Sequence, residues 1–354
     1  MLQVLRGWID RHLSDEEAIL FAAILGLFVV IILTMGTILA PLLTGIVLAY
    51  VMQGMIKIFA RYKIPNGIAV TLTFLLFLGG FIGFLFFIVP RVWRQMRSLF
   101  AEVPNMVTKS QGVLDKLAEK YPNFFSQNQV NSLVDMLNNE AGDIGQWLLS
   151  FSLSQLPVLV TVIVYMLLVP ILVFFLLKDK DQLIEWCVSF LPAKRPLMNQ
   201  IGEEMNLQIE NYLRGKFLEF FIVGSASYAF FTLFGLNYAA LLAFLVGLSV
   251  IVPYLGLIAV SFPVLIIAYM QYGWGGSFLY LVLGYSIIQG IDGMVIVPLL
   301  FSEAVNLHPI AIIIAVLVFG SWWGLWGVFF AIPLATLIKA IMTAWPSTRM
   351  PEET

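Results

Sequence analysis

The stretch LPVLVTVIVYMLLVPILVFFLL, residues 156–177, contains no charged side chain. A helix needs about 20 predominantly apolar residues to cross about 30 Å of hydrocarbon. The run is continuous, whereas the strands of a membrane β-barrel alternate between apolar and polar residues. Only helices and closed barrels satisfy every backbone group inside lipid, so this stretch predicts a membrane-spanning helix.

Seven further apolar segments accompany this one. They cover residues 18–35, 38–56, 66–90, 217–236, 238–271, 277–300 and 309–338. Of the 354 residues, 60% are hydrophobic and 11% are charged, whereas ordinary globular domains have about 45–50% apolar and about 25% charged residues. The sequence therefore predicts an all-α integral membrane protein with about eight hydrophobic segments. It excludes a common cytosolic enzyme, a disulfide scaffold and a disordered protein.

The composition also argues against several functional classes. The net charge is −2 and no region is strongly basic, so we expect no nucleic-acid partner. Cys187 is the single cysteine, and with His12 and His308 alone it cannot form a disulfide or a metal site. The chain has no P-loop and no hydrolase motif such as GxSxG. We therefore predict neither an enzyme nor a bound cofactor.

Two polar regions divide the apolar pattern. We predict an N-terminal three-span membrane region at 1–90, a soluble helical cap at 91–155, expected in the periplasm, a fourth span at 156–177, a cytoplasmic amphipathic helix region at 178–216, and a C-terminal membrane region with broken helices at 217–345. In the fourth of these regions, Leu197, Ile201, Met205 and Ile209 recur every four residues, which is typical of an amphipathic helix.

Lysine and arginine indicate the orientation. If both termini are cytoplasmic, 13 of the 19 basic residues lie inside, and the other six lie in 91–155. A loop of that length is largely exempt from the positive-inside rule. Arg91, Arg94 and Arg97 lie close to a span end and count against this orientation. The opposite orientation, however, would place the other 13 basic residues on the outer side of the membrane. We therefore predict cytoplasmic N- and C-termini.

Two of the late apolar segments are interrupted. Residues 238–271 contain Pro253-Tyr254-Leu255-Gly256 between two halves of 15 residues each, about 22 Å of helix per half. Residues 309–338 are broken by Gly320-Ser321-Trp322-Trp323-Gly324. Each segment is either one bent span or a re-entrant hairpin, and both must be of the same kind to keep Lys339 inside. Such interrupted segments point to a transporter's substrate site, although Pro and Gly also occur as plain kinks.

Asp292 lies near the middle of the apolar segment 277–300. An aspartate at the centre of a membrane helix costs roughly 2.5–3.5 kcal/mol on insertion scales. Ser286, Gln289 and Asp292 follow a spacing of i, i+3, i+6, which places them along one helix face. We predict that these three residues line a substrate or ion pathway. The alternative is a structural carboxylate buried between helices.

The remaining pathway candidates lie at the helix breaks. They are Pro253, Tyr254, Gly256, Pro298, Glu303, Asn306, His308 and Pro309. For the last stretch the alternative is an ordinary turn, in which Pro309 begins a helix and Asn306 or His308 lies near its cap. Gly320 and Gly324 form a GxxxG pattern, which permits close helix packing. Glu219 follows Lys216 by three residues, so the two side chains can pair.

Several stretches of the C-terminal half match the pattern of a known family. They are LFGLNY (233–238), VPYLG (252–256), Asp292-Gly293, Val297-Pro298, VNLHP (305–309) and GLWGVFFAIP (324–333). In order and spacing these stretches resemble the autoinducer-2 exporter family of predicted bacterial permeases. The residues of two stretches, SEAVNLHP (302–309) and FFAIPLATLIKA (329–340), resemble one branch of that family in particular.

The resemblance implies a multi-pass protein of the bacterial inner membrane that forms homo-oligomers and transports a solute. The expected partners are the lipid bilayer and a small polar solute, or a monovalent cation or proton. We predict a permease or exporter of an autoinducer-2-like solute, passive or ion-coupled. Two alternatives stay open: a Na⁺(Li⁺)/H⁺ antiporter, and a non-transporting membrane scaffold for envelope or division proteins.

Overall fold

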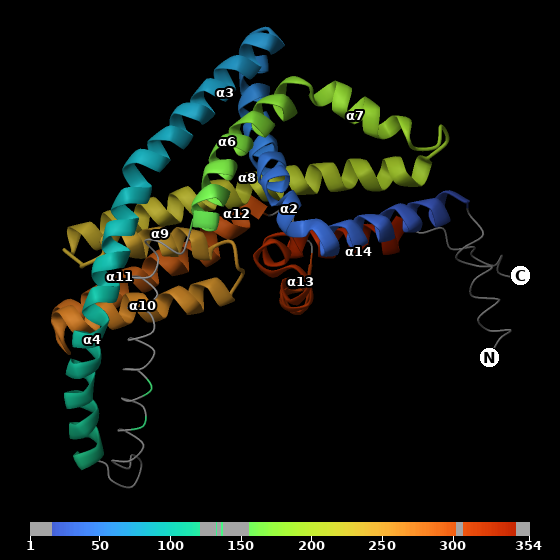
Figure 1. The fold of residues 1–354 in the computed structure, drawn as a ribbon. Coiled ribbons are helices and arrows are strands. Elements are labelled where there is room, and N and C mark those ends of the chain that lie inside the picture. The colour runs from blue at the N-terminus through green and yellow to red at the C-terminus, as the bar shows by residue number, and fades with distance from the viewer. Residues whose placement is uncertain (1–15, 121–131, 133–135, 137–155, 302–306, 345–354) are drawn as a thin grey trace, which may run out of the picture.

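The computed structural model describes all residues except 1–15, 121–131, 133–135, 137–155, 302–306 and 345–354 (Figure 1). The elements of this described part are all helices: α2 (Glu16–Arg61), α3 (Asn66–Gly83), the π-helical η1 (Phe84–Ile88), α4 (Val89–Lys120), α6 (Leu156–Lys178), α7 (Lys180–Ser189), α8 (Pro196–Leu233), α9 (Ala239–Ser249), α10 (Leu255–Tyr272), α11 (Gly276–Ile291), the π-helical η2 (Asp292–Ile296), α12 (Val297–Phe301), α13 (Pro309–Phe329) and α14 (Ala331–Ala344). Eight helical stretches within it are long and apolar enough to cross a membrane. The predicted all-α membrane fold is thereby confirmed.

Helix α2 contains the first two predicted spans in one element of 46 residues. A straight helix would separate Glu17 from Lys57 by about 60 Å. Glu17 nevertheless accepts a hydrogen bond from the backbone N–H of Met198 at 2.8 Å, and Lys57 Nζ lies 2.5 Å from Glu210 Oε1. These two partners are only about 18 Å apart along α8. Helix α2 therefore bends sharply, as Figure 1 shows, and Pro41 inside it removes a helical hydrogen bond.

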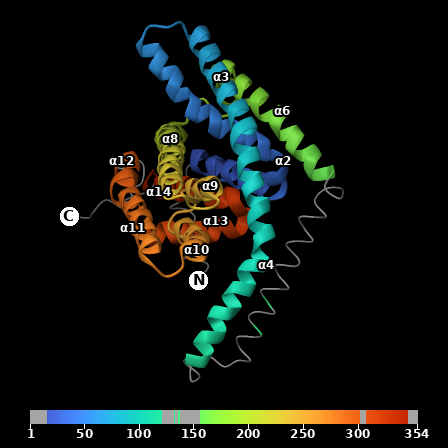
Figure 2. The ribbon, with the colours of Figure 1, turned by 90° about the vertical axis from the view of Figure 1, so that its left-hand side faces the viewer.

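Helices α3, η1 and α4 follow one another without a break from Asn66 to Lys120. No break therefore separates the predicted span 66–90 from the first part of the predicted cap. Gln95 on α4 accepts a hydrogen bond from the backbone N–H of Leu241 at 2.8 Å, which fixes α4 against the start of α9. Farther along, α4 extends past the other helices (Figure 2). Most of the cap beyond residue 120 lies outside the described residues, so its boundaries stay a prediction.

The tripeptide Ile-Val-Pro occurs at 88–90, 251–253 and 296–298, and each time the helix is irregular. Proline has no N–H, and its ring clashes with the carbonyl four residues earlier. Before Pro90 and Pro298 a π-helical turn absorbs this clash: the N–H of Val89 donates to Phe84 O, and that of Val297 donates to Asp292 O. At the remaining site, 251–253, no helix continues, because α9 has ended at Ser249.

The segment 238–271 is broken where the sequence predicts, and it forms a hairpin. Helix α9 ends at Ser249 and α10 begins at Leu255. Near the end of α10, Gln271 accepts a hydrogen bond from the Asn237 N–H at 2.7 Å and donates one to Gly235 O at 2.8 Å. The two ends of the segment therefore lie together, and α9 and α10 run back along each other.

The segment 309–338 also turns back on itself. Gly324 interrupts α13 with φ 59° and ψ −135°. A Cβ atom at Gly327 would lie 1.8 Å from Phe319 O, so the chain folds onto the preceding turn within a few residues. Ile312 near the start of α13 and Ile332 near the start of α14 line the same cavity. This segment therefore leaves and returns to one place, as the first hairpin does.

Helix α8 is the central element, since it contacts α2, α9, α11, α12 and α14. One end of α8 joins a buried apolar cluster that brings together the two ends of the described chain. The cluster consists of Ala18, Leu197, Ile201, Met205 and Ala340. The first turn of α2 and the last part of α14 thus pack against the start of α8, and Figure 1 shows α14 beside that end of α2.

Candidate functional site

A cavity of about 240 Å³ lies where the two broken segments approach α8. Its walls come from α8, from the tip between α9 and α10, from α11, η2 and α12, and from the first turns of α13 and α14. Four of the predicted pathway residues line it: Pro253, Tyr254, Gln289 and Asp292. The structure therefore brings the first break and the intramembrane carboxylate together in one place.

Asp292 is the first residue of the π-helical turn η2, and Gln289 lies one turn before it on α11. The Asp292 Oδ1 and Gln289 Nε2 atoms are buried, and neither has a hydrogen-bond partner among the described residues. Buried polar atoms almost always have partners, so an acceptor and a donor without one indicate a place where a ligand or water binds. π-Helical turns are themselves frequent at functional sites.

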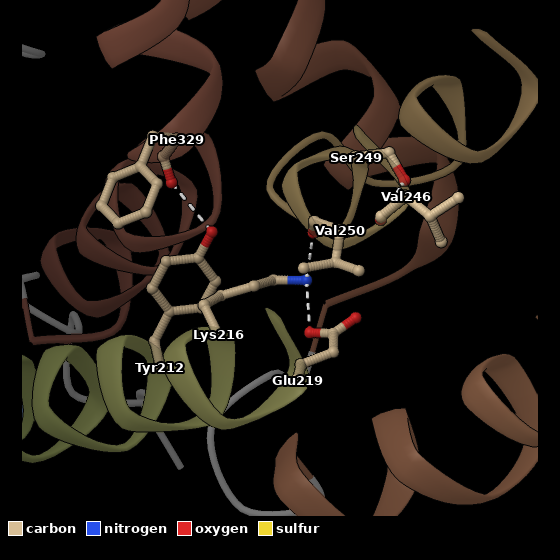
Figure 3. A network of polar contacts seen from close by, with 7 residues as sticks. All are labelled: Tyr212, Lys216, Glu219, Val246, Ser249, Val250 and Phe329. Carbon is tan, nitrogen blue, oxygen red and sulfur yellow. Dashed lines mark hydrogen bonds and ion pairs between the residues drawn. The ribbon is translucent and has the colours of Figure 1, made fainter. Parts of the chain in front are cut away.

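A buried ion pair lies across the cavity from these residues. Lys216 and Glu219 on α8 are 8% and 2% exposed, and Lys216 Nζ lies 2.8 Å from Glu219 Oε2. The same ammonium group donates a hydrogen bond to Val250 O at 2.7 Å (Figure 3). It also lies 5.0 Å from the centre of the Phe301 ring. The ion pair between Lys216 and Glu219 that their spacing in the sequence allows is therefore present, and it is buried inside the protein.

The contact with Val250 gives a hydrogen-bond partner to a backbone carbonyl at the first break. The last carbonyls of a helix have no partner inside the helix, and the hydrocarbon core contains no water to supply one. Local turns satisfy two of them, because the Ile251 N–H donates to Leu248 O and the Val252 N–H donates to Ser249 O. Lys216 satisfies Val250 O and places a positive charge at the negative end of the α9 dipole.

Tyr212 does the same in the second broken segment, at the junction between α13 and α14. Its hydroxyl donates a hydrogen bond to Phe329 O, the carbonyl of the last residue of α13, at 2.8 Å. Tyr212, Lys216 and Glu219 follow a spacing of i, i+4, i+7, so they form one stripe along α8. Figure 3 shows Tyr212 and Lys216 reaching from this stripe toward the two breaks. A single face of α8 therefore holds both broken segments at the cavity.

The tip of the first hairpin is a tight and strained turn. Tyr254 has φ 61° and ψ −52°, and the Leu255 N–H donates to Pro253 O at 2.6 Å, which defines a γ-turn of the rare positive-φ kind. A Cβ atom at Gly256 would lie 1.9 Å from Ser249 O, so only glycine fits there. The VPYLG stretch is thus explained by the turn that it builds at the cavity wall.

Three of the other predicted pathway residues lie away from the cavity lining. Ser286 is exposed on α11, and neither Gly256 nor Pro298 lines the cavity. The role of Pro298 is indirect, since the π-helical turn that begins at Asp292 directly precedes it.

The residues around the start of α13 form a helix cap. His308 Nδ1 accepts a hydrogen bond from the Ile310 N–H at 3.2 Å, and Pro309 begins the helix. This is the arrangement given above as the alternative to a pathway role. Glu303 and Asn306 lie outside the described residues.

The two glycines of the GxxxG pattern both belong to the turn inside α13. Gly324 has the positive φ that breaks the helix, and a Cβ atom at Gly320 would lie 2.8 Å from Val328 Cγ2. Packing against another copy of the chain stays a prediction for them.

The charges at the cavity favour a particular kind of ligand. With Asp292 ionised, the lining carries two carboxylates against the one ammonium group of Lys216. The carbonyl end of α9 adds further negative potential. The cavity is therefore suited to a cation or to a neutral solute that donates hydrogen bonds. Within the described residues, no group of three His, Cys, Asp or Glu side chains is arranged to hold a metal ion.

Comparison with known proteins agrees with this architecture. The family described as AI-2E family transporter matches residues 19–347. The chain is 42% identical over 353 residues to the protein named "Putative permease PerM" of Escherichia coli strain K12, and the match covers 100% of both chains. It is 25% identical over 314 residues to "Putative transport protein YueF" of Bacillus subtilis, covering 87% of this chain and 84% of the relative. PerM represents the branch of the family that the stretches 302–309 and 329–340 resemble.

The match to the family extends over nearly the whole chain, and the helices, their breaks and the intramembrane carboxylate are those of a multi-pass membrane protein. The chain therefore belongs to the AI-2E family of membrane transporters.

Proposed function

We propose that this transporter moves a small polar solute, autoinducer-2-like by family resemblance, across the bacterial inner membrane through the cavity at Asp292. One observation carries the proposal: Asp292 and Gln289 line the cavity between the broken segments, and each has a buried polar atom, Asp292 Oδ1 and Gln289 Nε2, without a hydrogen-bond partner among the described residues. A hydroxyl group of a solute could donate to the carboxylate while another oxygen accepts from the amide. Charge-assisted hydrogen bonds of this type are the stronger ones.

The proposed movement acts on the contacts between α8 and the two breaks. Tyr212 and Lys216 each make one hydrogen bond to a break carbonyl. A net intramolecular hydrogen bond is worth only about 0.5–3 kcal/mol, which solute binding can offset. Transport is passive or ion-coupled in this proposal, and a membrane potential supplies about 2.3 kcal/mol per charge per 100 mV.

The test is reconstitution of the full chain into liposomes with autoinducer-2, Na⁺ and Li⁺ as separate solutes. We expect autoinducer-2 flux in the natural protein. In Asp292→Asn the flux should fall about 10–100-fold, because a charged hydrogen bond of about 1.5–3 kcal/mol is lost. The matched control is Ser286→Ala on the same helix, which does not line the cavity and should keep full flux.

Two results would overturn the proposal. One is full autoinducer-2 flux in a well-folded Asp292→Asn protein. The other is Na⁺ or Li⁺ exchange for protons, detected with an enclosed pH dye, without any movement of the organic solute. The second result would identify the antiporter instead.

A further inference from the structure

A second cavity, of about 210 Å³, lies between α2, the end of α6, α7 and α8. It shares no lining residue with the cavity at Asp292. Its polar lining comes from Tyr50, Gln53, Lys57, Lys180, Asn206 and Glu210, and its apolar lining from Ile46, Ala49, Leu176, Leu183 and Ile184. One part of the wall can therefore bind a charged group, and another part can bind hydrocarbon.

The charge at this cavity is positive. Glu210 is its one carboxylate, and both Lys57 and Arg214 form ion pairs with it. Lys180 adds a third cation, and within the described part of the chain it has no ion-pair partner. Asp179 and Asp181 flank Lys180 in sequence but do not line the cavity. The lining thus carries two ammonium groups against one carboxylate, and that carboxylate is also paired with Arg214, so an incoming anion would reduce the excess of positive charge.

Helix α7 beside this cavity has the character of a membrane-surface helix. None of its residues is buried. Leu183, Ile184, Trp186 and the following Phe190 are 39%, 50%, 63% and 70% exposed. Figure 1 shows α7 standing out from the other helices. Exposed apolar and tryptophan side chains on a short helix are typical of the boundary between head groups and acyl chains.

We propose that this cavity binds the head group of an anionic glycerophospholipid. The phosphodiester oxygens would accept hydrogen bonds from the ammonium groups of Lys57 and Lys180, and Tyr50 and Gln53 lie where glycerol hydroxyls would follow. The acyl chains would lie along the apolar wall that ends at Ile184. Basic cavities between membrane helices on the cytoplasmic side are known to suit such head groups. The lipid would join α2, α7 and α8, and this role does not depend on which solute is carried.

The test is lipid retention by the purified full chain, measured by native mass spectrometry after delipidation and titration with phosphatidylglycerol or phosphatidylcholine. Each lysine near a phosphate is worth about fivefold in affinity. We expect the natural protein to prefer phosphatidylglycerol by about 25-fold. Lys180→Gln breaks no ion pair and should reduce this preference about fivefold, and Lys57→Gln/Lys180→Gln should nearly abolish it. Lys194→Gln is the matched control, because Lys194 is exposed and does not line the cavity.

Three outcomes would overturn the proposal. Equal retention of the two lipids by the natural protein would show that the net negative charge of the head group is not recognised. Unchanged preference in both the single and the double variant, with folding confirmed by circular dichroism, would place the lipid elsewhere. Displacement of phosphatidylglycerol by millimolar inorganic phosphate would show that the site binds a soluble anion, because a lipid held also by its chains resists such displacement.

Discussion

Lys216 has three partners: the Glu219 carboxylate, the Val250 carbonyl and the face of the Phe301 ring. Taking an ion out of water costs several kcal/mol, and only good geometry with further hydrogen bonds offsets this. Here one ammonium group neutralises a carboxylate and also caps a broken helix. Removal of either charge would leave the other buried and uncompensated.

We therefore expect Lys216→Met and Glu219→Gln each to destabilise the protein, the lysine change by about 3–5 kcal/mol because it leaves a bare carboxylate. The measurement is thermal unfolding in detergent micelles. The double variant Lys216→Met/Glu219→Gln should recover much of the loss, since no charge stays behind. Additive effects of the two changes would contradict the pairing. Lys194→Met, at an exposed position, serves as control.

Gly256 gives a purely steric prediction. In Gly256→Ala the new methyl group would lie 1.9 Å from Ser249 O, so the hairpin tip must open. We expect a loss of about 1–3 kcal/mol, the usual cost of overpacking. Gly79→Ala on α3 meets no atom within 4 Å and should be neutral or slightly stabilising. Equal unfolding temperatures for the two variants would show that the tip is looser than described.

At this scale the sequence indicates some site residues and hides others. Asp292 is predictable, because a carboxylate inside an apolar run is expensive and therefore rare. The roles of Tyr212 and Lys216 are not predictable, since their partners are backbone carbonyls 117 and 34 residues away. Their spacing of i, i+4, i+7 with Glu219 indicates only that the three side chains share one face of α8. It does not indicate which part of the protein that face contacts.

The helical elements were predictable where proline and glycine act locally. The break near Pro253 follows from the missing N–H, and the break at Gly324 follows from its positive φ. Whether a broken segment is a bent span or a hairpin depends on contacts between its two ends. For 238–271 those contacts come from Gln271, and no local pattern reveals them.

The hairpin predicts which side of the membrane labels reach. We replace the exposed Cys187 with serine and introduce Asn237→Cys or Trp274→Cys, one at each end of the hairpin. A membrane-impermeant maleimide should label both from the periplasm of intact cells. Lys194→Cys, before the other end of α8, should react only after permeabilisation. Labelling of the two hairpin positions from opposite sides would contradict the hairpin and favour a bent span.

At the scale of the whole molecule, the count of apolar segments and the all-α class came directly from composition and run length. The sharp bend of α2 and the junction of both chain ends did not, because they rest on packing between distant helices. Ala18 and Ala340 belong to one buried cluster. That contact supports the predicted placement of both termini on the same side of the membrane.

Fusions test that placement. Green fluorescent protein attached to either end should fluoresce, and alkaline phosphatase attached to either end should be inactive, because both termini are expected in the cytoplasm. A phosphatase fusion truncated after Lys120 is the control and should be active in the periplasm. Activity at one terminus and fluorescence at the other would require an odd number of crossings and would contradict the predicted orientation.

The candidate membrane span that begins at Asn66 ends at Val103, but α4 goes on to Lys120. These 17 further residues extend the helix by about 25 Å. Gln95 on the same helix is bonded to the backbone of Leu241 at the start of α9. A force applied at the far end of α4 would therefore be transmitted, as by a lever, to the first turn of the hairpin that walls the solute cavity.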